Sequence, residues 1–139
     1  MKNFFATTAL ALMPLAGIAQ PAAASCNLAM LNGPYSYNFN GYLTDGSSNT
    51  DLAVVGTINF DGAGKISGFD ESVVGGQAEP LETFTGSYKV KPDCSGTFKA
   101  NTTESGILHA FFTIDSSGNE IEFVDTDPGA SFAGSAKRF

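Results

Sequence analysis

Acidic residues stand at even spacing from aromatic residues in two β-patterned runs, and these are the side chains best placed to do chemistry. Glu82 shares one face of its run with Phe84 and Tyr88, and Glu71 shares a face with Phe69. If these faces point into an apolar interior, a carboxyl group there can act as a general acid or hold a ligand. If they point outward, they form a solvated surface. Both orientations are open, and all five residues are candidate ligand-binding residues.

The chain contains a single histidine, His109, which lies between Ile107 and Phe111 in an apolar run. A Ser-His-Asp triad would have to use this histidine, yet the sequence holds no Gly-x-Ser-x-Gly elbow. A packed or rim histidine is the favoured interpretation. His109 and Phe111 are kept as secondary candidates for the ligand site.

Metal and cofactor motifs are missing from the sequence. One histidine and two cysteines supply too few nitrogen and sulfur ligands for zinc. Asp125 and Asp127, with Asp115 and Glu120 one hairpin earlier, carry oxygen atoms that calcium accepts, but they do not follow an EF-hand loop. A solvated turn is the simpler interpretation. With no Walker loop or dinucleotide fingerprint either, we predict no metal and no cofactor.

The elements that must position these side chains are short strands. Period-two runs separated by Gly, Asp, Asn and Ser turns cover residues 34–43, 52–60, 65–74, 81–90, 97–103, 107–115, 120–126 and 131–139. Short loops favour antiparallel neighbours, and closing such a meander removes both sheet edges. The sequence therefore predicts an all-β fold, a single antiparallel up-and-down β-barrel of about eight strands.

Glycines in the middle of the runs support a curved barrel over a flat sandwich. Gly41, Gly56, Gly68 and Gly86 each interrupt a strand pattern, where glycine marks a bend or a close backbone approach. An eight-stranded barrel has an interior just wide enough to be filled by side chains or to hold one small ligand. The sequence leaves these two outcomes open.

The N-terminal segment has the pattern of a signal peptide. Lys2 precedes an apolar stretch, and small residues before Ser25 suit a signal peptidase, so we predict removal of residues 1–24 and a single barrel domain at 25–139. The stretch is short for a membrane span, although a membrane anchor stays an alternative. The expected location is outside the cytoplasm, secreted or periplasmic.

Cys26 and Cys94 are the only cysteines, and an even count behind a signal peptide favours a disulfide. The bridge would close a long loop and stabilise the fold by about 4 kcal/mol in the chain-entropy description. A lipid-modified Cys26 is the alternative, since it follows small residues. A catalytic thiol would need a base and an electropositive setting, and neither is indicated.

The chain is acidic, with a formal net charge of −7. Binding to nucleic acid needs a clustered basic surface, and docking on anionic lipid also needs positive charge. We therefore predict no nucleic-acid partner and no docking on anionic lipid. The short apolar stretch at the N-terminus separately predicts no membrane span in the mature chain. The oligomeric state is not predicted.

Three segments carry a resemblance to a known group: residues 56–64 (GTINFDGAG), 86–97 (GSYKVKPDCSGT) and 123–129 (FVDTDPG). Together they resemble small secreted microbial proteins of unassigned function, whose fold is similar to the allene oxide cyclase and dirigent barrels, which are lipocalin-like in outline. The resemblance covers most of the predicted mature chain, but its motifs are turns and strand ends. It implies a fold and no catalytic residue, because the cyclase catalytic set does not match residue by residue.

Two functions of different class fit this object. The first is a secreted carrier that binds a small apolar or aromatic molecule in the lumen, supported by 12 Phe and 4 Tyr. The second, implied by the resemblance, is a cofactor-free cyclase or isomerase acting on a lipid or polyketide. A surface protein with a filled barrel and no ligand is the third possibility, and a cavity in the barrel would separate it from the other two.

Overall fold

The computed structural model describes residues 25–139, and most of them lie in antiparallel strands. The predicted signal peptide lies outside the described residues. The strands are β1 (Asn32–Thr44), β2 (Asn49–Asp61), β3 (Lys65–Val74), β4 (Gln77–Ala78), β5 (Glu82–Val90), β6 (Ser95–Thr102), β7 (Ile107–Ile114), β8 (Glu120–Asp125) and β9 (Ala130–Arg138).

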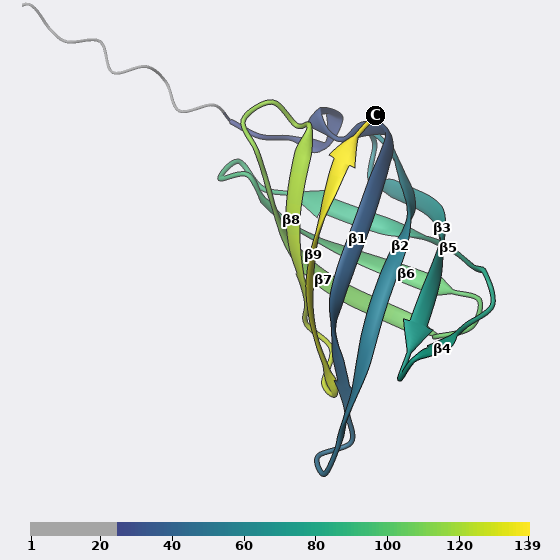
Figure 1. Cartoon of the computed structure of the whole chain (residues 1–139). Coiled ribbons are helices and arrows are strands. Elements are labelled where there is room, and N and C mark those ends of the chain that lie inside the picture. Colours follow the sequence, from purple (N-terminus) through teal and green to yellow (C-terminus); the bar gives the residue numbers. More distant parts are fainter. Residues whose placement is uncertain (1–24) are drawn as a thin grey trace, which may run out of the picture.

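The sheet closes on itself, as the sequence predicts. Each long strand pairs with its neighbour in the chain, β9 returns to pair with β1, and β2 pairs with β3 to complete the ring. The result is an eight-stranded up-and-down barrel, seen from the side in Figure 1. The two-residue strand β4 adds to the edge of β3 within a segment predicted to be a loop. A sequence pattern needs a longer run than this to show a strand.

Glycines allow neighbouring strands to approach closely where the barrel bends. A Cβ placed on Gly56 of β2 would lie 2.3 Å from the carbonyl oxygen of Phe69 on β3. A Cβ on Gly68 would lie 2.4 Å from the ring of Phe84, which packs over that position from β5. Real side chains do not tolerate such distances, so the expectation of close backbone approach at these glycines is confirmed.

A short plug closes one end of the barrel. The 3-10 helix η1 (Leu28–Met30) leads into Leu31, which is fully buried. The Tyr88 hydroxyl donates to the carbonyl oxygens of Leu28 and Leu31, both at 3.0 Å. The bond to Leu31 satisfies a buried backbone acceptor, and the Leu28 carbonyl also accepts from Leu31 N. The plug is therefore fixed to the barrel wall.

Arg138, near the end of β9, fastens the same plug from the other side. Its Nη2 donates to the carbonyl of Met30 and to the Tyr35 hydroxyl, each at 2.7 Å, and its guanidinium lies 5.2 Å from the centre of the Tyr35 ring. The Tyr35 hydroxyl in turn donates to the carbonyl of Gly118 in the β7–β8 turn. The first and last described strands and an intervening turn thus meet at the closed end.

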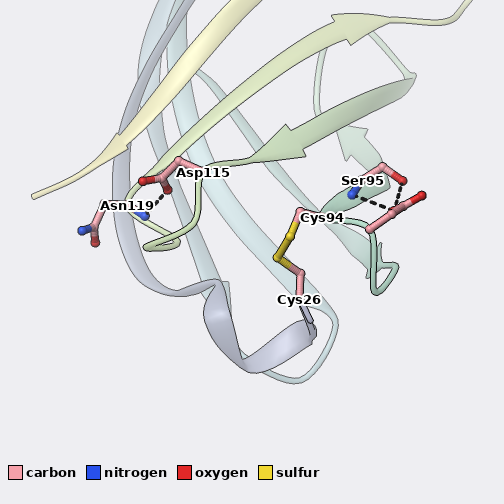
Figure 2. Close-up of a disulfide and its surroundings, with 6 residues drawn as sticks. Cys26, Cys94, Ser95, Asp115 and Asn119 are labelled. Carbon is pink, nitrogen blue, oxygen red and sulfur yellow. Dashed lines mark hydrogen bonds between the residues drawn. A yellow bond between two sulfur atoms is a disulfide. The ribbon is translucent and has the colours of Figure 1, made fainter. Parts of the chain in front are cut away.

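A disulfide between Cys26 and Cys94 joins the segment before η1 to the β5–β6 turn, and the predicted pairing is confirmed. Figure 2 shows the bridge between these two segments, with Asp115 of the β7–β8 turn nearby. The backbone continues the connection, because Cys26 N donates to the carbonyl of Pro92 and Ile114 N donates to the carbonyl of Cys94. The bridge spans 68 residues of sequence.

Removing this bridge should weaken the fold strongly. Closing a loop of this length stabilises the folded state by about 4 kcal/mol in the chain-entropy description. We expect Cys26→Ala/Cys94→Ala to lower the free energy of unfolding in urea by about 2–5 kcal/mol. Reductant should produce a similar loss in the native protein and none in the double variant. An unchanged urea midpoint would show that the plug holds without the bridge.

Candidate functional site

The barrel encloses a cavity of about 620 Å³. Phe60, Ile121 and Ala136 line its deep part near the plug, whereas Leu43 and Glu104 line it next to the loops at the opposite end. Its volume falls within the range of pockets that hold small molecules, roughly 300–1,000 Å³. The barrel is therefore hollow, with a floor at the end closed by η1.

Aromatic rings form much of the cavity wall. Phe39 of β1 stacks on Phe132 of β9 at 4.7 Å between ring centres, and Phe123 of β8 meets Phe39 edge-on at 5.9 Å. Phe98 of β6 continues the cluster and lies 5.9 Å from Phe123. Phe84 of β5 meets the ring of Tyr37 edge-on at 6.3 Å. Such a wall presents both faces and edges of rings to whatever occupies the lumen.

Three polar side chains lie in one row across the strands, with a glycine between two of them. Tyr37 on β1 is level with Gly56 on β2, Gly56 with Asp70 on β3, and Asp70 with Glu82 on β5. Because Gly56 has no side chain, the Tyr37 hydroxyl reaches across it and donates a hydrogen bond to Asp70 Oδ2. The row places a phenol and two carboxyl groups together on the cavity wall.

Glu82 is the one charged side chain buried among the described residues, with 8% of its surface exposed. Both of its hydrogen bonds end on Oε2, from Ser105 N at 3.1 Å and Ser105 Oγ at 2.7 Å. Within the described chain, Oε1 accepts no hydrogen bond. A loop residue therefore fixes the carboxyl group and leaves its second oxygen available in the cavity.

The protonation of Tyr37 and Asp70 is shifted by this setting. Burial raises the pKa of Tyr37, and its hydrogen bond to Asp70 adds to the shift, so the phenol stays neutral and donates. Burial also raises the pKa of Asp70; the hydrogen bond from Tyr37 opposes that shift, and the charge of Glu82 reinforces it. Two carboxyl groups side by side in an apolar wall disfavour double ionisation.

A second acidic pair, Asp125 and Asp127, follows β8 toward the open end and also lines the cavity. Burial raises the pKa of Asp125, whose Oδ1 accepts a hydrogen bond from Asp127 N at 2.6 Å. Asp127 Oδ1 lies 2.8 Å from His109 Nδ1, and Asp127 Oδ2 accepts from His109 N at 2.7 Å. The predicted turn is present; His109 of the neighbouring strand β7 holds the Asp127 carboxylate, and the Asp125 carboxylate is held by the backbone of the turn itself.

Three of the predicted ligand-binding residues lie on the interior side. Glu82 and Phe84 line the cavity, as their shared face predicts. Tyr88, on the same face of β5, lies below the cavity and beside the plug, and its ring contacts Phe60 edge-on at 5.0 Å. Its hydroxyl is occupied by the backbone of η1. Of the two orientations left open for this face, the structure shows the inward one, while Tyr88 belongs to the floor.

The other four predicted residues lie on the outer wall, which corrects the interior placement. On β3, Ile66 is buried and Gly68 faces the Phe84 ring, so the alternation sends Phe69 outward with 49% exposed, and Glu71 with it. On β7, Phe112 is fully buried, so Phe111 turns outward with 39% exposed, and His109 with it. His109 reaches the cavity only through its contact with Asp127.

Sequence reasoning missed Asp70 and Tyr37 as site residues. Asp70 shares a face with Ile66 and Gly68, and the opposite face carries Phe69 and Val73, so hydrophobicity alone points the wrong way on this strand. Tyr37 lies in the clearest alternating run of the chain and carries a hydroxyl that a buried position must satisfy. A search for acids opposite a buried tyrosine could have found the pair.

Comparisons with known proteins support the fold and go no further. No family model matches the chain, and a search of curated proteins found no relative. One solved structure is similar, described as a de novo design of a fluorescence-activating β-barrel. It aligns with a TM-score of 0.59 and 14% identity over 82% of this chain and 99% of its own. At that identity the likeness concerns the barrel alone, and it leaves the allene oxide cyclase resemblance without support.

No helix in the described part of the chain is long and apolar enough to cross a membrane. Within residues 25–139, no group of three or more His, Cys, Asp or Glu side chains is arranged to hold a metal ion.

The raised pKa of Asp70 has a consequence for stability. The unfolded carboxyl titrates near pH 3.9, so the stabilising contribution of Asp70 is complete below that pH and is lost as pH rises through its folded pKa. We expect Asp70→Asn to gain stability over the native protein as pH increases from about 4 to 8, by more than the ~0.5 kcal/mol typical of surface changes.

Urea unfolding at several pH values measures this difference. Asp51→Asn removes one carboxyl from an exposed position of β2 and controls for the loss of one negative charge. A stability difference between Asp70→Asn and the native protein that stays constant with pH would show that Asp70 is not perturbed.

Proposed function

We propose that this protein is a secreted carrier that binds one small, largely apolar molecule with an aromatic or alkyl body in the lumen of its barrel. The observation that carries the proposal is the cavity of about 620 Å³ lined by Phe39, Phe84, Phe98, Phe123 and Phe132. A filled barrel would have no such space. Small-molecule sites have this composition, a mostly apolar lining with a few placed polar groups.

One end of the barrel is closed and the other is not, and this difference supports reversible binding of a carried molecule. The plug and its disulfide close one end, and the cavity extends to the loops at the other. The disulfide also fits an oxidising, extracytoplasmic setting, in keeping with the signal peptide proposed for residues 1–24. A single opening suits a carrier, because the ligand enters and leaves by the same route while the floor stays folded.

An uncharged reporter dye tests the proposal. N-phenylnaphthylamine should bind saturably, at one site per chain, with increased fluorescence. Phe84→Ala should weaken binding by about tenfold, since a lost aromatic contact is worth roughly 1.5 kcal/mol or more. Phe69→Ala removes the same side chain from the outer wall and should leave the affinity unchanged.

A second variant, which fills the cavity, keeps the proposal testable if Phe84→Ala fails to fold. Ala130 lines the cavity near its open end, and Ala130→Trp should abolish dye binding while the circular dichroism of the barrel is retained. Absence of saturable binding by the native protein would refute the carrier, as would equal losses in Phe84→Ala and Phe69→Ala.

A second candidate, a cofactor-free cyclase or isomerase, is favoured by one specific observation. Tyr37, Asp70 and Glu82 bring a neutral phenol and two carboxyl groups of unequal environment to one wall of a cavity. Two carboxyl groups on one wall are the kind of pair that an isomerisation by proton transfer uses, because one group can give a proton while the other takes one. The overall reaction conserves the atoms of its substrate.

Turnover separates the enzyme from the carrier. With a fatty-acid allene oxide as substrate, an enzyme should form a ring product with a single configuration, detected by chiral chromatography. Glu82→Gln should then reduce the rate by about 10²-fold or more, the usual worth of a general acid or base, and leave dye affinity nearly unchanged. Racemic product at the uncatalysed rate would exclude this activity.

A further inference from the structure

The charged side chains that line the cavity are all of one sign. Within the described chain, the lining contains no Lys, Arg or His, and its charged members are Asp70, Glu79, Glu82, Glu104, Asp125 and Asp127. Several lie near the open end, so a ligand approaching the lumen meets negative potential first. An anionic ligand would be repelled at that entrance and would find no positive partner in the cavity.

Asp70 and Glu82 form an inner pair of acids, and no described cationic side chain lines the cavity beside them. Asp70 and Glu82 are direct partners across the β3–β5 ladder, on the face that lines the cavity. Tyr37 holds Asp70 by Oδ2 alone, and Ser105 holds Glu82 by Oε2 alone. Within residues 25–139, Asp70 Oδ1 and Glu82 Oε1 accept no hydrogen bond. Two fixed carboxyl groups thus share a wall with one acceptor oxygen each to spare.

Bringing two like charges together in an apolar wall is unfavourable, and burying Glu82 adds to that cost. A ligand cation between the carboxyl groups would offset both the repulsion between them and the cost of burying Glu82, because it attracts each carboxylate. The partner is unlike a bound metal ion, because the described chain supplies no cluster of three or more metal-ligating side chains. It is instead a group that needs two acceptors and carries an apolar body.

The aromatic wall fits such a group as well. Phe84 follows Glu82 by two residues on the same face of β5, and its ring lies beside that of Tyr37. Phe39 and Phe123 extend the wall on β1 and β8. Ring faces attract cations, most strongly away from water. The same cavity thus offers carboxylates for a charge and rings for both the charge and the body attached to it.

We propose that the lumen is selective for a small organic amine, whose ammonium group binds between Asp70 and Glu82 and whose apolar body lies against Phe39, Phe84 and Phe123. This inference rests on the proposed carrier function and specifies its ligand class. Tyr37 and Ser105 act as positioning residues, because each orients one carboxyl group. Glu79 and Glu104 at the open end attract the ligand.

Three probes of one shape and different charge test the selectivity. Naphthylmethylamine, naphthylmethanol and naphthoate are titrated into the purified protein by calorimetry near neutral pH. We expect the amine to bind at least about tenfold more tightly than the alcohol, since a buried charge pair of this kind usually contributes that much. Naphthoate should show no measurable binding.

Variants assign that preference to the inner pair. Glu82→Gln and Asp70→Asn keep the size of each side chain and should each weaken amine binding by about tenfold or more. Binding of the alcohol should weaken less, so the preference for the amine falls in both variants. Glu71→Gln removes the same charge from the outer wall one residue from Asp70 and should change neither affinity. Binding of the alcohol also reports that each variant is folded.

The outcomes separate this inference from the function on which it rests. Equal affinity for amine and alcohol, or tighter binding of naphthoate, overturns the amine selectivity and leaves the carrier standing. An amine preference that survives both inner variants overturns the assignment to Asp70 and Glu82. If neither these probes nor N-phenylnaphthylamine binds, the carrier function fails and the ligand class fails with it.

Discussion

Closure of the sheet between β2 and β3 is the constraint on which the rest of this structure depends. Eight strands leave a narrow interior, and glycines stand where neighbouring strands come closest. Gly56 illustrates the effect, because its missing side chain both lets β2 approach β3 and opens the path from Tyr37 to Asp70. The polar row on the cavity wall therefore depends on this close approach. Neither the cavity nor the polar row would survive in an open sheet of the same strands.

The two ends of the barrel divide stability from binding. At the closed end, the disulfide, Tyr35, Tyr88 and Arg138 satisfy the polar groups of the plug and fix it in place. Above this floor, Asp70 and Glu82 on the cavity wall each accept hydrogen bonds on one oxygen only. A structure that buries Glu82 without a cationic partner accepts an electrostatic cost there. The disulfide and hydrogen bonds at the plug stabilise the fold, and this stability offsets the cost of burying Glu82.

Much of the fold could be predicted from the sequence, and the site only in part. Turn residues and period-two alternation define strands locally, so the eight runs and the closed barrel followed from them. The grouping of Glu82 with three apolar residues on one face of β5 was also clear, while the orientation of that face was left open. On β3 and β7 both faces carry apolar side chains, and the choice depends on which face meets Phe84 or the core across the lumen. That information is tertiary. It placed Phe69, Glu71, His109 and Phe111 outside and brought Asp70 in.

The position of the chain ends gives the molecule a direction. Residue 25 precedes the plug, and Phe139 N donates to the carbonyl of Pro34 at the start of β1, so both described ends leave from the closed end (Figure 1). Any fused protein, affinity tag or surface linkage attached at either end would stand behind the floor of the barrel. An immobilised molecule would present its opening to solution. The fold therefore suits display on a surface, because the point of attachment and the opening of the cavity lie at opposite ends of the barrel.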